Sequence, residues 1–369
     1  MQNNNFAIIG ASYLQLPLIL KAKEMGYVTH VFAWSANDVG EKVADYFYPI
    51  SIVEKDKILQ KCKEINICGV SSIASDLAII TVNYVASNLG LVSNSISCTL
   101  KSTNKFLMRR SLVRGGDPCP KFTLINENED LSLLKISYPV IVKPTDRSGS
   151  RGIYKVNSFD DLLSATKKAF KESFEKKVLI EEYVTGHEYS VEYISHNGIH
   201  HFLSVTKKYT TGAPFFIETG HLEPAPIDSN LENKIRSIVE HALKTLEISE
   251  GASHSEIKID ENGCIKIIEI GGRMGGDCIG SDLVYYSTGI DYVKAVIQIA
   301  CGQEPELSPV GIKQSVKVHY IITESDRDKF LELKKNHPES IIKEVYMHFD
   351  LIGKTTDSSN RAGCYITKG

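Results

Sequence analysis

The chain has 369 residues, enough for two or three domains with substantial cores. Its formal net charge is −3 with acidic and basic residues interspersed, so composition indicates neither nucleic acid nor an anionic membrane surface as partner. The eight cysteines are scattered without a C-x-x-C pair, and no apolar stretch reaches the ~20 residues of a membrane span. We therefore expect a soluble, cytoplasmic protein with reduced cysteines.

The N-terminal part of the chain alternates between short apolar runs and helical segments. The first apolar run leads into a glycine turn at Gly10, a helical segment and a second apolar run that ends at Trp34, and another helical stretch covers 55–67. This alternation predicts a parallel sheet with helices on both faces, so the fold class begins as α/β.

The rest of the chain reads as α+β. Strand-like runs cover 138–145, 153–156 and 177–184, and Ser158 with Asp161 predicts the start of a helix between the last two. A hairpin is predicted over 189–205, then a helix capped by Ser229 with Glu232 and a small α+β segment at the end.

The turn at Gly10 lies where a dinucleotide-binding fingerprint would be found, after a strand and before a helix. Ser12 and Gln15 occupy the second and third glycine positions of that fingerprint. Without the second glycine the backbone cannot closely approach a pyrophosphate, so we interpret the turn as structural rather than as an NAD site.

A polar glycine loop follows the strand that ends near Lys143. The loop consists of Ser148, Gly149, Ser150, Arg151 and Gly152. Glycines and serines can direct N–H groups and hydroxyls toward phosphate oxygens, and the lysine adds a positive charge. A flexible hairpin tip beside a solvated lysine fits the same residues. No G-K-[ST] closes the loop, which excludes a Walker A motif.

An Asn262-Gly263 turn separates two strand-like runs near residue 260 and predicts a second hairpin. If these two residues are the centre of the turn, Glu256 and Glu269 face each other across the ladder, with Cβ atoms roughly 4.5–5.5 Å apart. Such a like-charged pair is tolerated when a cation lies between the carboxylates, and Mg²⁺ is suited to oxygen ligands. Another register, or neutralisation by Lys258, Lys266 or Arg273, would also resolve the conflict.

Taken together, these motifs resemble those of the ATP-grasp superfamily. In chain order they are Lys105, "VIVKP" with its serine-glycine loop, "LIEEYVTGHEYSVE", "SEIKI" and "IIEIGGR". The resemblance is greatest to carboxylate–amine ligases near the L-amino-acid ligases and the carbamoyl-phosphate-synthase-like group. It implies an ATP-grasp fold of several domains, in which residues 1–104 form a Rossmann-like pre-ATP-grasp domain, 105–195 a lid, 196–310 a core with the metal site, and 311–369 a small α+β appendage.

The resemblance also implies roles for individual residues. Lys105 and Lys143 would contact the phosphates of ATP, covered by the serine-glycine loop. The segment Glu181, Glu182, Tyr183 and Val184 would hold the adenine, and Glu188 the ribose hydroxyls. Glu256 and Glu269 would bind Mg²⁺, with Mn²⁺ as an alternative, and Arg273 would face the acyl phosphate or the substrate carboxylate. Many relatives have a metal-binding Asn where this chain has Gly271, which leaves the number of metal ions open.

The function implied is ATP-dependent ligation of a carboxylate to an amine through an acyl phosphate, releasing ADP and phosphate. Lys208, Glu218 and His221 are candidates for substrate recognition, and a solvated loop is the alternative for this segment. The expected partners are small molecules, with amino acids first among them. Whether two copies of the chain form a homodimer is left open. Alternative functions are a carbamoyl-phosphate or purine-pathway type ligase, a non-catalytic ATP-binding module, and a nicotinamide-dependent oxidoreductase.

Overall fold

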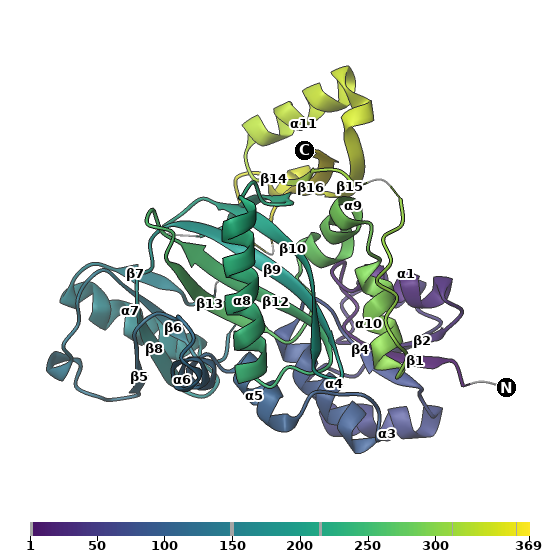
Figure 1. Cartoon of the computed structure of the whole chain (residues 1–369), viewed down its shortest axis with the longest axis horizontal. Coiled ribbons are helices and arrows are strands. Elements are labelled where there is room, and N and C mark those ends of the chain that lie inside the picture. The colour runs from purple at the N-terminus through teal and green to yellow at the C-terminus, as the bar shows by residue number, and fades with distance from the viewer. Residues whose placement is uncertain (1–2, 148–150, 214–215, 312, 359) are drawn as a thin grey trace.

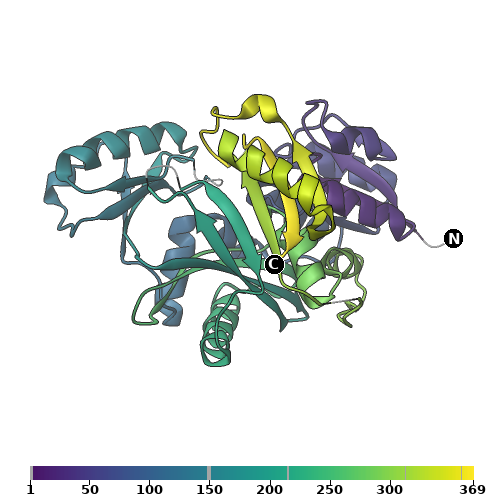
Figure 2. The ribbon, with the colours of Figure 1, turned by 90° about the horizontal axis from the view of Figure 1, so that it is seen from above.

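The computed structural model describes residues 3–147, 151–213, 216–311, 313–358 and 360–369. Three sheets organise this part of the chain (Figures 1 and 2). A parallel sheet near the N-terminus and a small antiparallel sheet lie at opposite ends of the molecule, and an eight-stranded sheet lies between them.

The N-terminal sheet has the strand order β3-β2-β1-β4, and each of its pairings is parallel. Its elements and the helices that follow are β1 (Asn5–Ile9), α1 (Leu16–Glu24), β2 (Val28–Phe32), α2 (Val39–Val43), β3 (Tyr46–Tyr48), α3 (Lys55–Ile65), β4 (Gly69–Ser71), α4 (Asp76–Asn88), α5 (Ile96–Thr103) and α6 (Lys105–Gly115). On β1, Phe6 and Ile8 pack into one core with α1, while Ala7 and Ile9 pack into another with α3 and α4. Helices therefore cover both faces, as the alternating pattern predicts.

The small sheet has the order β5-β8-β6-β7 and is antiparallel. It contains β5 (Phe122–Asn126), β6 (Val140–Pro144), β7 (Tyr154–Val156), α7 (Phe159–Glu172) and β8 (Lys177–Glu182). The Ser158 hydroxyl accepts a hydrogen bond from the Asp161 N–H at 3.2 Å, which confirms the predicted start of α7.

The eight-stranded sheet has the order β13-β12-β9-β10-β11-β14-β16-β15. Its elements and helices are β9 (His187–His196), β10 (Ile199–Thr210), β11 (Glu218–Glu223), α8 (Ser229–Thr245), β12 (Gly251–Ile259), β13 (Ile265–Gly271), α9 (Val284–Thr288), α10 (Tyr292–Ala300), β14 (Val316–Ile321), α11 (Glu324–Asn336), β15 (Ile341–Met347) and β16 (Gly363–Lys368). Strand β9 falls almost wholly in the predicted lid range but pairs with β10 and β12, and β14 to β16 extend the same sheet. The four predicted domain ranges stay a prediction.

The hairpin of β12 and β13 brings Glu256 opposite Glu269, but its loop is longer than predicted and one strand contains a bulge. The loop has three residues rather than two: Asp260 and Cys264 pair, and Gly263 adopts a φ of +72°. This loop alone would shift the register by one residue. A bulge that leaves Ile268 without a ladder partner then shifts it back, so the two carboxylates share one face.

Helix α8 begins at Ser229, but the cap is the residue before it. The Asp228 carboxylate accepts a hydrogen bond from the Leu231 N–H at 2.8 Å. The prediction that Ser229 caps the helix is therefore wrong by one residue. Asp228 has an extended backbone and reaches the third residue along, which is the geometry that satisfies an exposed helix N–H.

Across the described residues, no helix combines the length and the apolar character needed to cross a bilayer.

This cap yields a test. Asp228→Ala should lower the free energy of unfolding by about 1 kcal/mol, because one N–H of the first turn loses its acceptor. Ser229→Ala is the matched control and should change it by less than about 0.5 kcal/mol. Urea unfolding measures both, and equal effects would contradict the assignment of the cap.

Candidate active site

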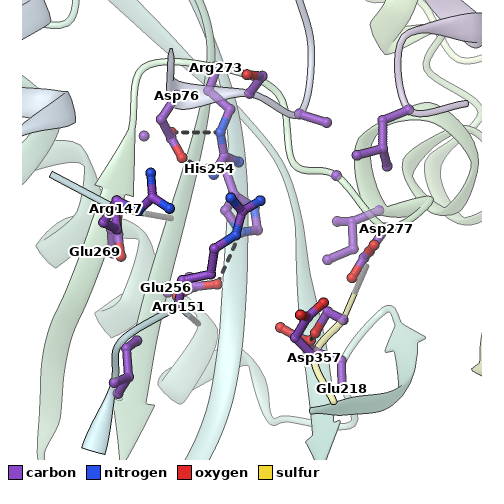
Figure 3. Close-up of a pocket in the computed structure, with 18 of the residues that line it drawn as sticks. Asp76, Arg147, Arg151, Glu218, His254, Glu256, Glu269, Arg273, Asp277 and Asp357 are labelled. Atoms are coloured by element: carbon purple, nitrogen blue, oxygen red, sulfur yellow. Dashed lines mark hydrogen bonds and ion pairs between the residues drawn. The ribbon is translucent and has the colours of Figure 1, made fainter. Parts of the chain in front are cut away.

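A cavity of about 730 Å³ lies where the three sheets meet. Its wall combines the carboxyl edge of the parallel sheet, strands β6 and β8 of the small sheet, and β10 to β13 of the large sheet. Figure 3 shows charged side chains around this cavity, among them Asp76 of α4, Glu256 of β12 and Glu269 of β13. We take this cavity as the candidate active site.

The two opposed carboxylates on the β12–β13 hairpin line the cavity, and each has a lysine beside it. The Lys105 Nζ lies 2.6 Å from Glu269 Oε1, and the Lys208 Nζ lies 2.5 Å from Glu256 Oε1. Burial by itself lowers the pKa of Lys105, but the Glu269 carboxylate more than offsets this and raises it. These two lysines are the direct partners of the like-charged pair, and Arg273 adds attraction to both carboxylates from a greater distance.

Lys143 lies on β6 and is buried against Glu181 of β8. Its Nζ is 2.7 Å from Glu181 Oε2, and the Arg109 Nε is 2.7 Å from Glu181 Oε1. Burial alone would raise the pKa of Glu181, but the neighbouring guanidinium and ammonium lower it. Burial lowers the pKa of Lys143. Glu181 thus holds both cations in place through ion pairs inside the protein.

The last residue of β8, Glu182, lines the cavity with Tyr183 and Val184 that follow it, and Glu188 of β9 lines the cavity as well. Lys155 places its Nζ 4.0 Å from the centre of the Tyr183 ring. Of the predicted glycine loop, Arg151 lines the cavity and Gly152 has a φ of +72°. The remaining loop residues, Ser148, Gly149 and Ser150, lie outside the described residues.

Arg273 lines the cavity and forms a two-pronged ion pair with Asp76. Arg273 Nε lies 2.8 Å from Asp76 Oδ1, and Nη2 lies 3.1 Å from Oδ2 (Figure 3). Asp76 is the first residue of α4, so this contact joins the N-terminal sheet to the end of β13. The sequence prediction placed Arg273 in the site but did not include Asp76.

The candidates for substrate recognition lie together on β10 and β11. Lys208 and His221 are paired in the ladder, and Lys208 Nζ is 3.9 Å from Glu218 Oε1. Burial, followed by the positive charge of Lys208, lowers the pKa of His221 to about 3, so its imidazole is neutral at neutral pH. At this end of the cavity Asp277 is held by Arg361, with Nη2 2.6 Å from Oδ1.

Sequence reasoning also missed a buried histidine beside the carboxylate pair. His254 Nδ1 lies 2.5 Å from Glu192 Oε1, and its Nε2 lies 3.6 Å from Glu256 Oε1. Burial opposes protonation, yet the Glu192 carboxylate raises the pKa of His254 to about 9. A Cβ at Gly275 would lie 2.7 Å from His254 Nδ1, so glycine leaves room for this pair. In the sequence, the "GG" at 275–276 was the available signal that a buried group lies close to the backbone there.

The turn at Gly10 is closed by its own glutamine. The Gln15 side chain accepts from the Ser12 N–H at 3.2 Å and donates to the Ile73 carbonyl at 2.8 Å. Its amide lies against Gly10, where an added Cβ would be 2.9 Å from Gln15 Cδ. The side chain thus fills the inside of the turn, which supports the structural interpretation.

The donor set at Glu256 and Glu269 fits a hard divalent cation in part. Two opposed carboxylates supply oxygen ligands, which Mg²⁺ prefers. Within the described residues, no group of three or more His, Cys, Asp or Glu side chains converges on one point. Further ligands would have to come from elsewhere, and phosphate oxygens and water are the usual ones for Mg²⁺.

Comparison with known proteins shows which domain the chain contains. Residues 136–282 match the family model described as the ATP-grasp domain. The match covers less than half of the chain and identifies an ATP-grasp domain within these residues. The predicted fold class, ATP-grasp with a Rossmann-like N-terminal sheet, is confirmed.

Individual relatives match parts of this chain. A D-alanine–D-alanine ligase of Thermosipho africanus is 32% identical over 34% of this chain and 35% of its own length. An alanine–anticapsin ligase of Bacillus subtilis is 24% identical over 74% of this chain and 65% of its own. The chain thus spans about one third to two thirds of these curated relatives.

A solved structure shares the whole fold. The L-amino acid ligase from Bacillus licheniformis superposes with a TM-score of 0.83 and 22% identity, covering 100% of this chain and 93% of that one.

The buried ion pairs of the candidate active site give a second test. Glu181→Gln should lower the free energy of unfolding by about 3–5 kcal/mol, because Lys143 and Arg109 lose a buried counter-charge. Its neighbour Glu182 pairs with Lys266 near the surface, and its side chain is 38% exposed. Glu182→Gln should therefore cost less than about 1 kcal/mol in the same urea unfolding measurement. Equal losses would contradict the assigned difference between these adjacent glutamates.

Proposed function

We propose that this chain is an ATP-dependent carboxylate–amine ligase. A substrate carboxylate attacks the γ-phosphate of ATP and forms an acyl phosphate and ADP; an amine then attacks the acyl carbon and releases phosphate. The observation that carries the proposal is the convergence of Lys105, Lys143, Glu256, Glu269 and Arg273 on one cavity of an ATP-grasp protein.

The chain's own residues would act by position and charge. Lys143 and Lys105 come from different elements and reach the same cavity, where they would neutralise phosphate oxygens. Both are held by carboxylates, Glu181 and Glu269, so their ammonium groups are oriented before substrate arrives. Glu256 and Glu269 would hold Mg²⁺, which supplies positive charge to the phosphates.

We assign nucleotide recognition to the part of the cavity wall formed by the end of β8 and the residues that follow it. The backbone of Glu182 and Val184 would contact the adenine edge, and Tyr183 lies beside them. Glu188 would accept hydrogen bonds from the ribose hydroxyls, for which a carboxylate is suited. Lys258 would support this wall, because its Nζ reaches the Val184 carbonyl at 3.4 Å.

The substrates are assigned to the end of the cavity near Glu218 and His221. A carboxylate there suits the ammonium group of an amino acid, while Arg273 suits a carboxylate or an acyl phosphate. The neutral His221 can accept or donate one hydrogen bond. We therefore expect amino acids as substrates, in keeping with the names of the L-amino acid ligase and alanine–anticapsin ligase relatives.

Nucleotide choice can be tested without knowing the substrates. ATP with Mg²⁺ should raise the melting temperature of the protein, because a ligand that binds only the folded state stabilises it. At a concentration of 100 times Kd the gain is about 2.7 kcal/mol. NAD at equal concentration should leave the melting temperature unchanged; the reverse result would favour the oxidoreductase alternative.

The reaction can be tested by a phosphate-release screen of amino-acid pairs, with mass detection of products. We expect release that requires both a carboxylate and an amine partner, together with a product lighter by one water than the two combined. Bicarbonate, formate and glycine are included because they are carboxylate or amine substrates of the alternative ligases. Release only with these would replace the proposed function.

Variants test the assigned residues. Lys143→Ala and Glu269→Ala should each lower kcat by about 100-fold or more, because each removes a charge directed at the phosphates. Glu182→Gln serves as the control, since the proposal uses only the backbone of that residue. Full activity in both alanine variants would contradict the mechanism.

A further inference from the structure

The ion pair between Asp76 and Arg273 connects two parts of the molecule that are far apart in sequence. Asp76 opens α4 at the carboxyl edge of the parallel sheet, and Arg273 follows the end of β13. Each side chain is 15% exposed. The pair lies in the cavity wall, in the same region as Glu269 and His254 (Figure 3).

The hydrogen bonds of Arg273 occupy only part of its guanidinium. Nε and Nη2 donate to the two oxygens of Asp76, and Nη1 donates to the Met274 carbonyl at 3.3 Å. A guanidinium has five N–H groups. Two therefore remain, one on Nη1 and one on Nη2, and no described residue accepts from them. Two parallel N–H groups on one edge match the two oxygens of a carboxylate or phosphate.

Gly271 leaves the space that this pair needs. A Cβ at position 271 would lie 2.9 Å from Asp76 Oδ1 and 3.2 Å from Arg273 Nε. Its backbone is not among those with positive φ, so conformation alone does not demand glycine there. A Cβ at the next residue, Gly272, would approach nothing closer than Ser102 Oγ at 3.3 Å.

We propose that Asp76 is a positioning residue for the ligation. It fixes the guanidinium of Arg273 so that the Nη1–Nη2 edge is presented to an oxyanion of the carboxylate substrate or its acyl phosphate. Gly271 is glycine because a side chain there would displace the pair. The sheet that carries Asp76 thereby takes part in the reaction without touching the substrate. This inference rests on the proposed ligase function.

The first experiment changes the carboxylate alone. Asp76→Asn removes the charge and one acceptor, so kcat/KM for the carboxylate substrate should fall by about 10- to 100-fold, since the partner of a buried charge pair is lost. The KM for ATP should change by less than about twofold. Asp76→Glu keeps the charge and should recover part of the loss. A general structural defect would move both constants and would not be rescued by glutamate.

The second experiment uses the two neighbouring glycines. Gly271→Ala should lower kcat/KM for the carboxylate substrate by about tenfold, equivalent to about 1.4 kcal/mol, whereas Gly272→Ala should stay near wild type. In an Asp76→Ala background, Gly271→Ala should add little further loss, because the pair it disturbs is already gone. Fully additive losses would overturn the proposed role of Gly271.

Failure of this inference and failure of the proposed function give different results. If wild type ligates amino acids and Asp76→Asn matches it in every constant, the positioning role is wrong. If wild type shows no substrate-dependent phosphate release, the proposed function is wrong. In that case a double-mutant cycle with Asp76→Ala and Arg273→Ala in urea unfolding decides whether the pair exists. A coupling below about twofold in the unfolding constant would overturn the pair as well.

Discussion

Two glutamates placed opposite each other on one hairpin set the constraint on which the site depends. Like charges in that position destabilise a sheet unless opposite charges lie beside them. Glu256 and Glu269 obtain these from Lys208 on β10 and Lys105 at the start of α6. Elements outside the hairpin thus supply the charges that compensate its glutamates, and the charges that would serve catalysis also link parts of the cavity wall.

The same balance of charge extends to deeper layers. Lys143 and Arg109 share one buried carboxylate, Glu181, and His254 is held by Glu192, which is also buried. Desolvation makes each unpaired charge costly, so these groups are fixed in pairs before any ligand binds. Groups fixed in this way need little reorganisation when charge develops on a substrate, which is the condition for electrostatic catalysis.

Gly271 departs from the expected sequence pattern, and the fold gives a physical reason for this departure. The resemblance to the ATP-grasp superfamily implies a metal-binding Asn at this position, and the sequence left the consequence of Gly271 open. In the folded chain its missing side chain makes room for Asp76 and Arg273. The parallel sheet, whose turn at Gly10 we interpret as structural, would then serve by holding an arginine in the cavity.

The sequence by itself determined the parallel N-terminal sheet, helix α7 and the ATP-grasp resemblance, because these depend on local periodicity, capping and ordered motifs. It predicted that Glu256 and Glu269 face each other, but from a two-residue turn that the structure does not have. It could not show that a bulge at Ile268 sets the register, since a bulge depends on neighbouring strands. The partners of the buried charges also came only from the tertiary structure. Asp76 lies 197 residues from Arg273 in sequence, and nothing local to either residue predicts their contact. Burial requires each such charge to have a partner, but only the packing of the three sheets decides which one.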